Sequence, residues 1–320
     1  MLKILFSGYR DPLHSSAGGY DWISKMPQTE AIFADNVPFG FIPQHKRGKF
    51  INVFFLELFS KFKARKFDIL HHFYGDNLKL KCGKSNNYKT VATVHMDIKG
   101  RKNQDHFIRV LRSLDGVIVL STSQKRELKK YGINAEFIPH GFNKPAFEKI
   151  ETGVDHSKLN IVVSGSNYRD IDTLLKTVKK CLERRPDIVF HLLGQPKEIK
   201  DILTSYNNCI CYKRLDDNTY YSLISDCDYN FLPLTFATAN NALLEAQFLG
   251  VTSILPNISG ISDYAAPPSL NIYYNTQEEL DNIFVSLTKS AQSDAIVNYA
   301  KRFEWCNIYP LLYDYYKSLL

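Results

Sequence analysis

Short apolar runs alternate with helical patterns along the whole chain, and no other feature constrains the fold as strongly. Strand-like runs fall at Lys3–Phe6, Ile69–Phe73, Thr90–Val94, Gly116–Leu120 and Glu136–Ile138, and again at Leu159–Val163, Ile188–Leu192, Tyr229–Leu232 and Val251–Leu255. Helices are predicted between them, for example at Ser123–Tyr131, Asp172–Arg185, Thr219–Ser225 and Ala242–Leu249. Such alternation indicates parallel sheets with helices on both faces. The sequence therefore predicts an α/β fold.

The alternating pattern occurs twice, and the polar, irregular segment FNKPAFEKIETGVDHSK (Phe142–Lys158) separates the two copies. A chain of 320 residues is also longer than one hydrophobic core usually serves. We therefore expect two Rossmann-like domains that face each other across a cleft. Ligands of such domains bind at the carboxyl ends of the strands, so we expect the functional site in the cleft.

Positive charge is concentrated in the first half of the chain. Residues 1–150 contain 25 Lys+Arg and 13 Asp+Glu, a net charge of +12, whereas residues 151–320 contain 15 and 20, a net charge of −5. The basic half is expected either to meet an anionic partner or to be a solvated basic surface. The sequence contains no recognisable aromatic-plus-basic nucleic-acid-binding module, so we expect no nucleic-acid partner.

Composition and cysteine spacing favour a cytoplasmic globular protein. Apolar residues make up 44% of the chain, no uncharged stretch reads as a spanning helix, and the first residues, MLKILFSGYRD, lack the layout of a signal peptide. The six cysteines show no zinc spacing and are interpreted as buried thiols in a reducing compartment: Cys82, Cys181, Cys209, Cys211, Cys227 and Cys306.

The stretch NIVVSGSNYRDIDTLLKTV (Asn160–Val178) predicts a strand, a turn of small residues and the start of a helix. Gly165 and Ser166 lie in the turn, and Arg169 follows it. A small-residue turn, a cation and a helix start can together hold an anion. The stretch is therefore a candidate phosphate-binding loop.

A second candidate stretch is NNALLEAQFLGVTSIL, where Asn240 and Asn241 are good N-caps for a helix. The unpaired N–H groups of the first helical turn attract phosphate. Glu245 lies one turn further on, and a carboxylate can accept hydrogen bonds from two vicinal hydroxyl groups of a ribose. Taken alone, the stretch also fits an exposed helix glutamate.

Taken together, these stretches resemble the GT-B glycosyltransferases, in particular the large group numbered family 4. LDGVIVLSTSQKRELKKYGINAEFIPHGFN (Leu114–Asn143) is similar to that group's strand, helix and "iPnGvd" linker, and Asn160–Leu175 to its "vGr…Kg…lL". Leu215–Leu234 resembles its "el..ly..adv.v.PS", and Asn241–Asp263 its "lEAma.G.PvI" box. The closing RFEWCNIYPLLYDYYKSLL resembles its "FsW" segment. The resemblance covers nearly everything after Asp68, in the same order.

The resemblance implies GT-B architecture. An acceptor-side domain is expected at residues 1–145 and a nucleotide-sugar donor domain at 146–302. A C-terminal helix at about residues 303–320 is expected to return to the first domain.

In this family the second domain binds a nucleotide-sugar, which implies roles for several residues here. Glu245 would hold the ribose hydroxyls, Arg169 the diphosphate, and the backbone around Ala242 and Leu243 the distal phosphate. Gly165 and Ser166 would form the phosphate loop. A fixed guanidinium and helix-end amides would stabilise the departing diphosphate, so no metal ion or other cofactor is expected. The pair Asp216-Asp217 fits the first turn of a helix rather than a metal site.

The sequence departs from the family pattern in two places. The glutamate that often lies eight positions before the ribose glutamate is Ala237 here, so the usual contact to the transferred sugar is missing or moved. The arginine that usually follows the first glycine is Ser166. Either Arg169 acts alone on the diphosphate, or Lys213 and Arg214 assist it; the pair also fits a solvated strand end.

In the first domain, His95 ends the strand of TVATVHMD and resembles the family histidine near the donor sugar and acceptor. A neutral imidazole there could bind a hydroxyl or pass a proton. Gly18 and Gly19 correspond to a glycine loop near the acceptor and diphosphate. His71-His72 is interpreted as packing and wall-lining.

The segment His45–Asp68 is basic and aromatic, with phenylalanines at helical spacing beside four cations: Lys61, Lys63, Arg65 and Lys66. It fits either an interfacial helix on anionic lipid or a helix packed on the sheet with a basic outer face.

We therefore predict a cytoplasmic, membrane-peripheral glycosyltransferase that moves a sugar from a nucleoside diphosphate to a glycan or lipid-linked acceptor. The family implies retention at the anomeric carbon and a role in bacterial surface polysaccharide synthesis. Two alternatives stay open: a catalytically silent binding protein of the same fold, which Ala237 favours, and a sugar-nucleotide epimerase.

Overall fold

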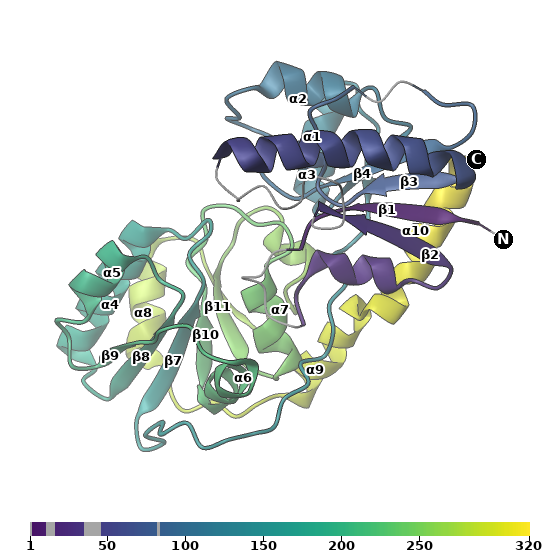
Figure 1. Ribbon diagram of the computed structural model, residues 1–320. Coiled ribbons are helices and arrows are strands. Elements are labelled where there is room, and N and C mark those ends of the chain that lie inside the picture. Colours follow the sequence, from purple (N-terminus) through teal and green to yellow (C-terminus); the bar gives the residue numbers. More distant parts are fainter. Residues whose placement is uncertain (1, 11–16, 35–45, 82–83) are drawn as a thin grey trace. The chain divides into compact units, whose positions relative to one another are not determined.

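The chain folds into two compact units, each described below by itself. The structure is a computed structural model that describes residues 2–10, 17–34, 46–81 and 84–320 (Figure 1). Unit 1 comprises residues 1–14, 19–142 and 303–320, and unit 2 comprises residues 15–18 and 143–302. The C-terminal helix α10 (Trp305–Ser318) thus belongs to unit 1.

Unit 1 is built on a six-stranded sheet with the order β2-β1-β3-β4-β5-β6, in which all paired strands are parallel. The strands are β1 (Ile4–Gly8), β2 (Thr29–Phe33), β3 (Ile69–His72), β4 (Lys89–Val94), β5 (Gly116–Val119) and β6 (Glu136–Phe137). After β1 the chain turns to one side to form β2, and it then returns to place β3 on the other side. The sheet therefore has its topological switch point between β1 and β3.

Helices cover both faces of this sheet because its strand residues point alternately to opposite sides. Leu5 and Leu70 pack with α1 (Lys46–Lys63), on the face that also receives α2 (Gln104–Leu111) and α3 (Thr122–Lys130). On the other face His71 contacts Tyr316 of α10 at 2.6 Å. In Figure 1, α1 and α10 accordingly lie on opposite sides of β1 and β3.

Unit 2 contains a second parallel six-stranded sheet, with the order β12-β11-β10-β7-β8-β9. The strands are β7 (Leu159–Ser164), β8 (Ile188–Leu193), β9 (Cys209–Cys211), β10 (Tyr229–Phe231), β11 (Thr252–Pro256) and β12 (Ile272–Tyr274). Strands β8 and β9 lie on one side of β7, and β10, β11 and β12 lie on the other. The switch point of this sheet therefore lies between β7 and β10.

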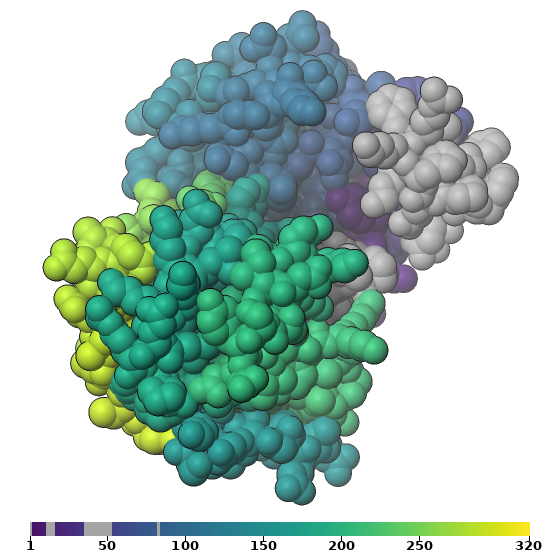
Figure 2. Space-filling model, turned by 90° about the vertical axis from the view of Figure 1, so that its left-hand side faces the viewer, coloured from purple at the N-terminus to yellow at the C-terminus, as the bar shows by residue number. Residues whose placement is uncertain are grey.

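The unit 2 sheet is also covered on both faces. Ile161 and Val163 pack with α4 (Ile171–Arg184), α5 (Lys197–Leu203) and α8 (Gln277–Ser286). Val162 points the other way, toward α6 (Asp217–Asp226) and α7 (Asn241–Phe248). Helix α9 (Asp294–Ala300) completes the unit. The β9 side of unit 2, coloured teal to green, faces the viewer in Figure 2.

The central strands were predicted from the sequence, whereas the edge strands β2 and β12 were not. Each predicted strand and helix is present, with ends that differ by one or two residues. Strand β2 has only Ile32 and Phe33 buried, and β12 only Tyr274. Because an edge strand has one unpaired side and less buried surface, its sequence lacks the continuous apolar run that marks a central strand. Helices α5, α8 and α9 of unit 2 were also missed.

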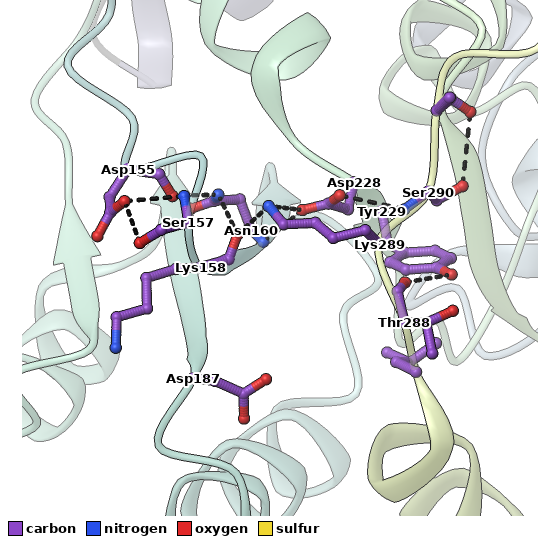
Figure 3. A network of polar contacts seen from close by, with 12 residues as sticks. Asp155, Ser157, Lys158, Asn160, Asp187, Asp228, Tyr229, Thr288, Lys289 and Ser290 are labelled. Carbon is purple, nitrogen blue, oxygen red and sulfur yellow. Dashed lines mark hydrogen bonds and ion pairs between the residues drawn. The ribbon is translucent and has the colours of Figure 1, made fainter.

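A polar network closes the amino edge of the unit 2 sheet around Asp228 (Figure 3). Its carboxylate accepts from Asn160 N at 2.7 Å and from Ser290 N at 3.1 Å, and Lys289 Nζ lies 3.2 Å away. Asp228 N in turn donates to Asn160 O at 2.8 Å. The network ties β7 and β10 to the segment after α8. It stands at the edge opposite to the strand ends where ligands bind.

The cysteine interpretation is correct in part. Cys181, Cys209 and Cys227 are buried free thiols, and Cys211 is half-buried. Cys306 is exposed because it lies on the outer side of α10, so the prediction was wrong there. Cys82 lies outside the described residues. Among the described residues, no helix is long and apolar enough to cross a membrane.

We expect His191 to make the fold sensitive to acid. Its ring contacts Tyr212 Oη at 2.8 Å and Asn160 Oδ1 at 2.9 Å, and burial lowers its pKa to about 4. An unfolded histidine has a pKa near 6.5, so below that pH the unfolded chain binds the extra proton and folding is disfavoured. Between pH 7 and pH 5, wild type should lose about 1–2 kcal/mol more stability than His191→Gln.

Urea unfolding at the two pH values measures this difference, with His156→Gln, a change at an exposed histidine, as the matched control. Equal acid sensitivity of wild type and both variants would show that His191 is not the group responsible.

Candidate functional site

Two loops meet at the switch point of unit 2. The loop after β7 joins the loop after β10 through Asp170 N to Pro233 O, 2.8 Å, and Thr235 N to Tyr168 O, 2.9 Å. Gly165 and Tyr168 have φ values of +73° and +54°. A non-glycine residue with such a φ is strained by about 1–3 kcal/mol and persists only where its surroundings hold it, often at functional sites. The strained turn at the carboxyl end of β7 is therefore a candidate part of a functional site.

Arg169 lies inside this turn and is only 8% exposed. Its guanidinium donates to Ser164 O and, at 3.1 Å, to Asn167 O, and burial lowers its pKa to about 10. Nε has no hydrogen-bond partner among the described residues. Arg169 thus holds a fixed positive charge against the backbone of the predicted phosphate loop and still has an unsatisfied donor.

Glu245 is buried near the start of α7 and is held by a tyrosine. Asn240 caps the helix by accepting from Leu243 N at 3.1 Å, as the sequence predicts. Glu245 is 3% exposed, and Tyr220 Oη donates to its Oε2 at 2.7 Å. Burial and the nearby carboxylate raise the pKa of Tyr220, which is also close enough to Arg169 for a charge interaction. The alternative of an exposed helix glutamate is therefore wrong.

Gln195 connects the ends of β7 and β8. Its Nε2 lies 3.0 Å from Gly165 O and 3.2 Å from Val163 O and Leu193 O, whereas Oε1 has no partner among the described residues. The Ser164 hydroxyl lies beside Tyr220 without a well-aligned hydrogen bond. Unsatisfied buried groups cost free energy and need an explanation. A ligand bound at this edge of the sheet would explain these atoms, because it could supply the missing hydrogen-bond partners.

Tyr220 and Gln195 were missed by the sequence analysis. Tyr220 lies in NTYYSLIS, where two adjacent tyrosines give no sign of which one reaches the site. Gln195 follows a strand-ending glycine, and this position could have drawn attention to it. Both residues act through contacts between segments far apart in the sequence.

The other predicted donor-site residues lie around this cluster. Leu243 N is already engaged by the Asn240 cap, and Gly165 N donates to Leu193 O at 2.9 Å. Ser166 is exposed in the turn, and Ala242 is half-buried in the first turn of α7.

Lys213 and Arg214 are exposed after β9, which β8 separates from β7. Asp216 caps α6 by accepting from Thr219 N at 3.0 Å, as expected. No group of three or more metal-ligating side chains occurs in the described part of the chain.

In unit 1, His95 is half-buried after β4. Its Nε2 lies 2.8 Å from Phe73 O, and its N donates to Asp76 Oδ2 at 2.7 Å. Because a carbonyl only accepts, Nε2 carries a proton in this contact. The rings of Tyr20 and Tyr74 lie 4.6 and 4.8 Å away.

His71 and His72 are buried, as interpreted from the sequence. Gly19 belongs to unit 1, and Gly18 to unit 2, where Gly18 O accepts from Asn241 Nδ2 at 3.0 Å.

Comparison with known proteins agrees with this fold. Residues 23–144 match the model of Glycosyltransferase Family 4. A search of curated protein sequences finds no match. Among solved structures, sucrose-phosphate synthase from Thermosynechococcus elongatus is 17% identical with a TM-score of 0.69, and the alignment covers 99% of this chain and 88% of that one.

The Anabaena protein HepE, in complex with UDP and glucose, is 15% identical with a TM-score of 0.70 over 99% of this chain and 100% of that one. A Rickettsia africae glycosyltransferase is 14% identical with a TM-score of 0.67 over 99% and 98%. The chain therefore shares its fold with these proteins, and residues 23–144 resemble Glycosyltransferase Family 4. All but the last two of the matched residues lie in unit 1, so the ligand roles of the unit 2 residues stay predictions.

Arg169→Ala should destabilise unit 2 by about 1–3 kcal/mol, because it leaves Ser164 O and Asn167 O without their donor. Urea unfolding measures the loss. Arg184→Ala, at an exposed position of α4, is the matched control. If the two variants unfold alike, Arg169 does not brace the turn.

Proposed function

We propose that this protein transfers a sugar from a nucleoside diphosphate to a glycan or lipid-linked acceptor in surface polysaccharide synthesis. The observation that carries the proposal is the hydrogen bond from half-buried Tyr220 to buried Glu245, beside the braced Arg169 at the β7–β10 switch point. Ligands of open α/β sheets bind at such points. HepE, which shares the fold, is known in complex with UDP-glucose, and this supports a nucleotide-sugar as the donor.

The geometry suits departure of a nucleoside diphosphate. As the bond between sugar and phosphate breaks, negative charge grows on the phosphate oxygens. Arg169 would hold positive charge there in a fixed orientation, and its Nε would gain the partner that it lacks. Glu245, oriented by Tyr220, would accept from the ribose hydroxyls. The family precedent favours retention at the anomeric carbon and chemistry without a metal ion.

His95 would act on the acceptor side through Nδ1, since Phe73 O fixes the proton on Nε2. From this position it could accept a hydrogen bond from a sugar hydroxyl or relay its proton.

One observation favours the silent binding protein as a second candidate. Ala237 is 3% exposed, so the place of the family's additional glutamate is filled by a buried methyl group. A protein without that contact could still bind a nucleotide-sugar. The epimerase would need further acid–base carboxylates in the site. Asp216 does not supply one, because its carboxylate caps α6.

The proposal can be tested by incubating the protein with a panel of nucleotide-sugars and measuring the slow hydrolysis of each one. The nucleotide-sugar that is hydrolysed identifies the donor. Release of UDP or GDP from one donor supports the transferase. Binding without release supports the silent protein, and interconversion of the donor sugar supports the epimerase.

Glu245→Ala should weaken binding of the nucleoside diphosphate by about 2–4 kcal/mol, because two charge-assisted hydrogen bonds are lost. Tyr220→Phe should weaken it less, since the carboxylate remains but is less well oriented. Calorimetry with UDP, GDP and their 2′-deoxy analogues measures both effects. The ribose assignment is wrong if the 2′-hydroxyl contributes equally in wild type and Glu245→Ala.

The outer face of α1 carries the features of a membrane-binding surface. Leu58, Phe59 and Phe62 are 44%, 40% and 69% exposed, although the opposite side of the helix packs on the sheet through Leu56. Cations flank this apolar patch: Lys61, Lys63, Arg65 and Lys66. We propose that it rests on an anionic membrane at its cytoplasmic face, because apolar side chains ringed by cations suit that interface.

Changing the four cations to Gln should release the protein from anionic vesicles, because each contributes about 1 kcal/mol near such a surface. Wild-type binding should also weaken as salt rises. Co-sedimentation measures both. The control variant changes four exposed lysines elsewhere in unit 1 to Gln: Lys99, Lys102, Lys129 and Lys130. If both variants lose binding equally, only overall charge matters.

A further inference from the structure

The segment that precedes β7 packs along helix α6. Both belong to unit 2, and Figure 1 shows the segment passing α6 on its way to β7. The segment leads into β7 and α6 leads into β10, which pairs with β7 in parallel. The chains that enter these two strands therefore lie side by side at the amino edge of the sheet. Helix α6 itself comes back from the carboxyl edge, where the candidate site lies.

Lys149 holds the last turns of α6. Its ammonium group donates to Ser222 O at 3.1 Å and to Ser225 Oγ at 2.5 Å. The same group pairs with the Asp226 carboxylate at 2.5 Å. The next residue, Ile150, donates its N–H to the hydroxyl group of Ser222 at 3.0 Å. Because a cation near the carboxyl end of a helix also interacts favourably with the helix dipole, these contacts fix that end of α6.

Two further contacts reach the first half of the helix. Glu148 N donates to Asn218 Oδ1 at 3.1 Å. The ring of Phe147 lies 5.6 Å from the ring of Tyr221, which is fully buried. Residues 147–150, called the α6 strap below, thus contact the helix from its first turn to its last.

Another side of α6 carries the tyrosine of the candidate site. Successive residues of an α-helix are turned by about 100° around its axis, so neighbouring side chains meet different partners. Tyr221 meets the α6 strap, whereas Tyr220 donates its hydroxyl group to Glu245 Oε2 at 2.7 Å. A hydrogen bond weakens steeply with distance and angle, so a small displacement of α6 would change the orientation of the Glu245 carboxylate.

We propose that Phe147 and Lys149 are positioning residues for the candidate donor site. By holding α6 they orient Tyr220, and through Tyr220 they orient the Glu245 carboxylate toward the ribose of a nucleoside diphosphate. The proposal rests on the proposed donor function, since it says how that site is kept in shape. The Lys149 side chain is 50% exposed. Such an ion pair contributes little to stability, so its removal should leave the fold intact and reveal the effect on the site.

The orientation of Tyr220 can be measured by ¹⁹F NMR on the full chain labelled with 3-fluorotyrosine. The Tyr220 resonance is the one that is absent in Tyr220→Phe. It should shift in Lys149→Met and in Phe147→Ala, and it should stay near its wild-type position in Lys149→Arg, which keeps the cation. Lys289→Met is the matched control, because Lys289 is 47% exposed and pairs with Asp228, outside α6, at 3.2 Å.

Nucleotide binding gives the second measurement. Calorimetry compares UDP or GDP, whichever binds wild type, with its 2′-deoxy analogue. The preference for the 2′-hydroxyl group should fall by about threefold or more in Lys149→Met, because a misdirected carboxylate loses that contact. It should be unchanged in Lys289→Met.

A purely structural strap would lower stability and leave both measurements at their wild-type values. The proposal is therefore overturned if either the Tyr220 resonance or the 2′-hydroxyl preference is the same in wild type, Lys149→Met and Phe147→Ala. Absence of UDP and GDP binding by wild type would instead contradict the proposed donor function. The Tyr220 resonance would then decide by itself whether the α6 strap orients this tyrosine.

Discussion

Both units depend on the same constraint. Their strands pair in parallel, and the direction in which strands are added to the sheet reverses once. In each sheet the chain extends to one side of its first strand and then continues on the other side. The loops that leave the two central strands therefore diverge at one place along the carboxyl edge, between β1 and β3 in unit 1 and between β7 and β10 in unit 2. Polar and aromatic side chains lie together at both switch points, although sheet packing does not require them there.

The buried charged side chains at these two switch points are held in place by hydrogen bonds. Arg169 is held by backbone carbonyls, Glu245 by Tyr220, and Glu57 by two backbone N–H groups. Asp228 is held just as firmly, but at the amino edge, where it only joins segments of unit 2. A buried charge is tolerated once it is hydrogen-bonded, so burial alone does not indicate function. Position at the switch point, together with unsatisfied atoms such as Arg169 Nε, separates the candidate ligand site from the structural network.

Much of the fold could be predicted from the sequence, but the edge strands β2 and β12 could not. Central strands such as β7 and β8 are buried on both faces and read as continuous apolar runs. Strands β2 and β12 are only partly buried, so their sequences lack the continuous apolar runs of the central strands. The helix caps Asn240 and Asp216 were predictable because a cap depends on residues only three positions apart. The burial of Glu245 and the partner that orients it depend on α6, which is remote in the sequence.

The sequence by itself determined the α/β class and the two-fold repetition of the pattern, and it led to the prediction that Arg169 and Glu245 belong to a ligand site, because periodicity and short motifs are local properties of the chain. Only the tertiary structure decided that Arg169 braces its own loop, that Tyr220 orients Glu245, and that Lys149 holds the last turns of α6. These facts depend on which strands become neighbours. Strand order is fixed by the packing of whole helices and strands, and it places side by side residues that the sequence keeps tens of positions apart.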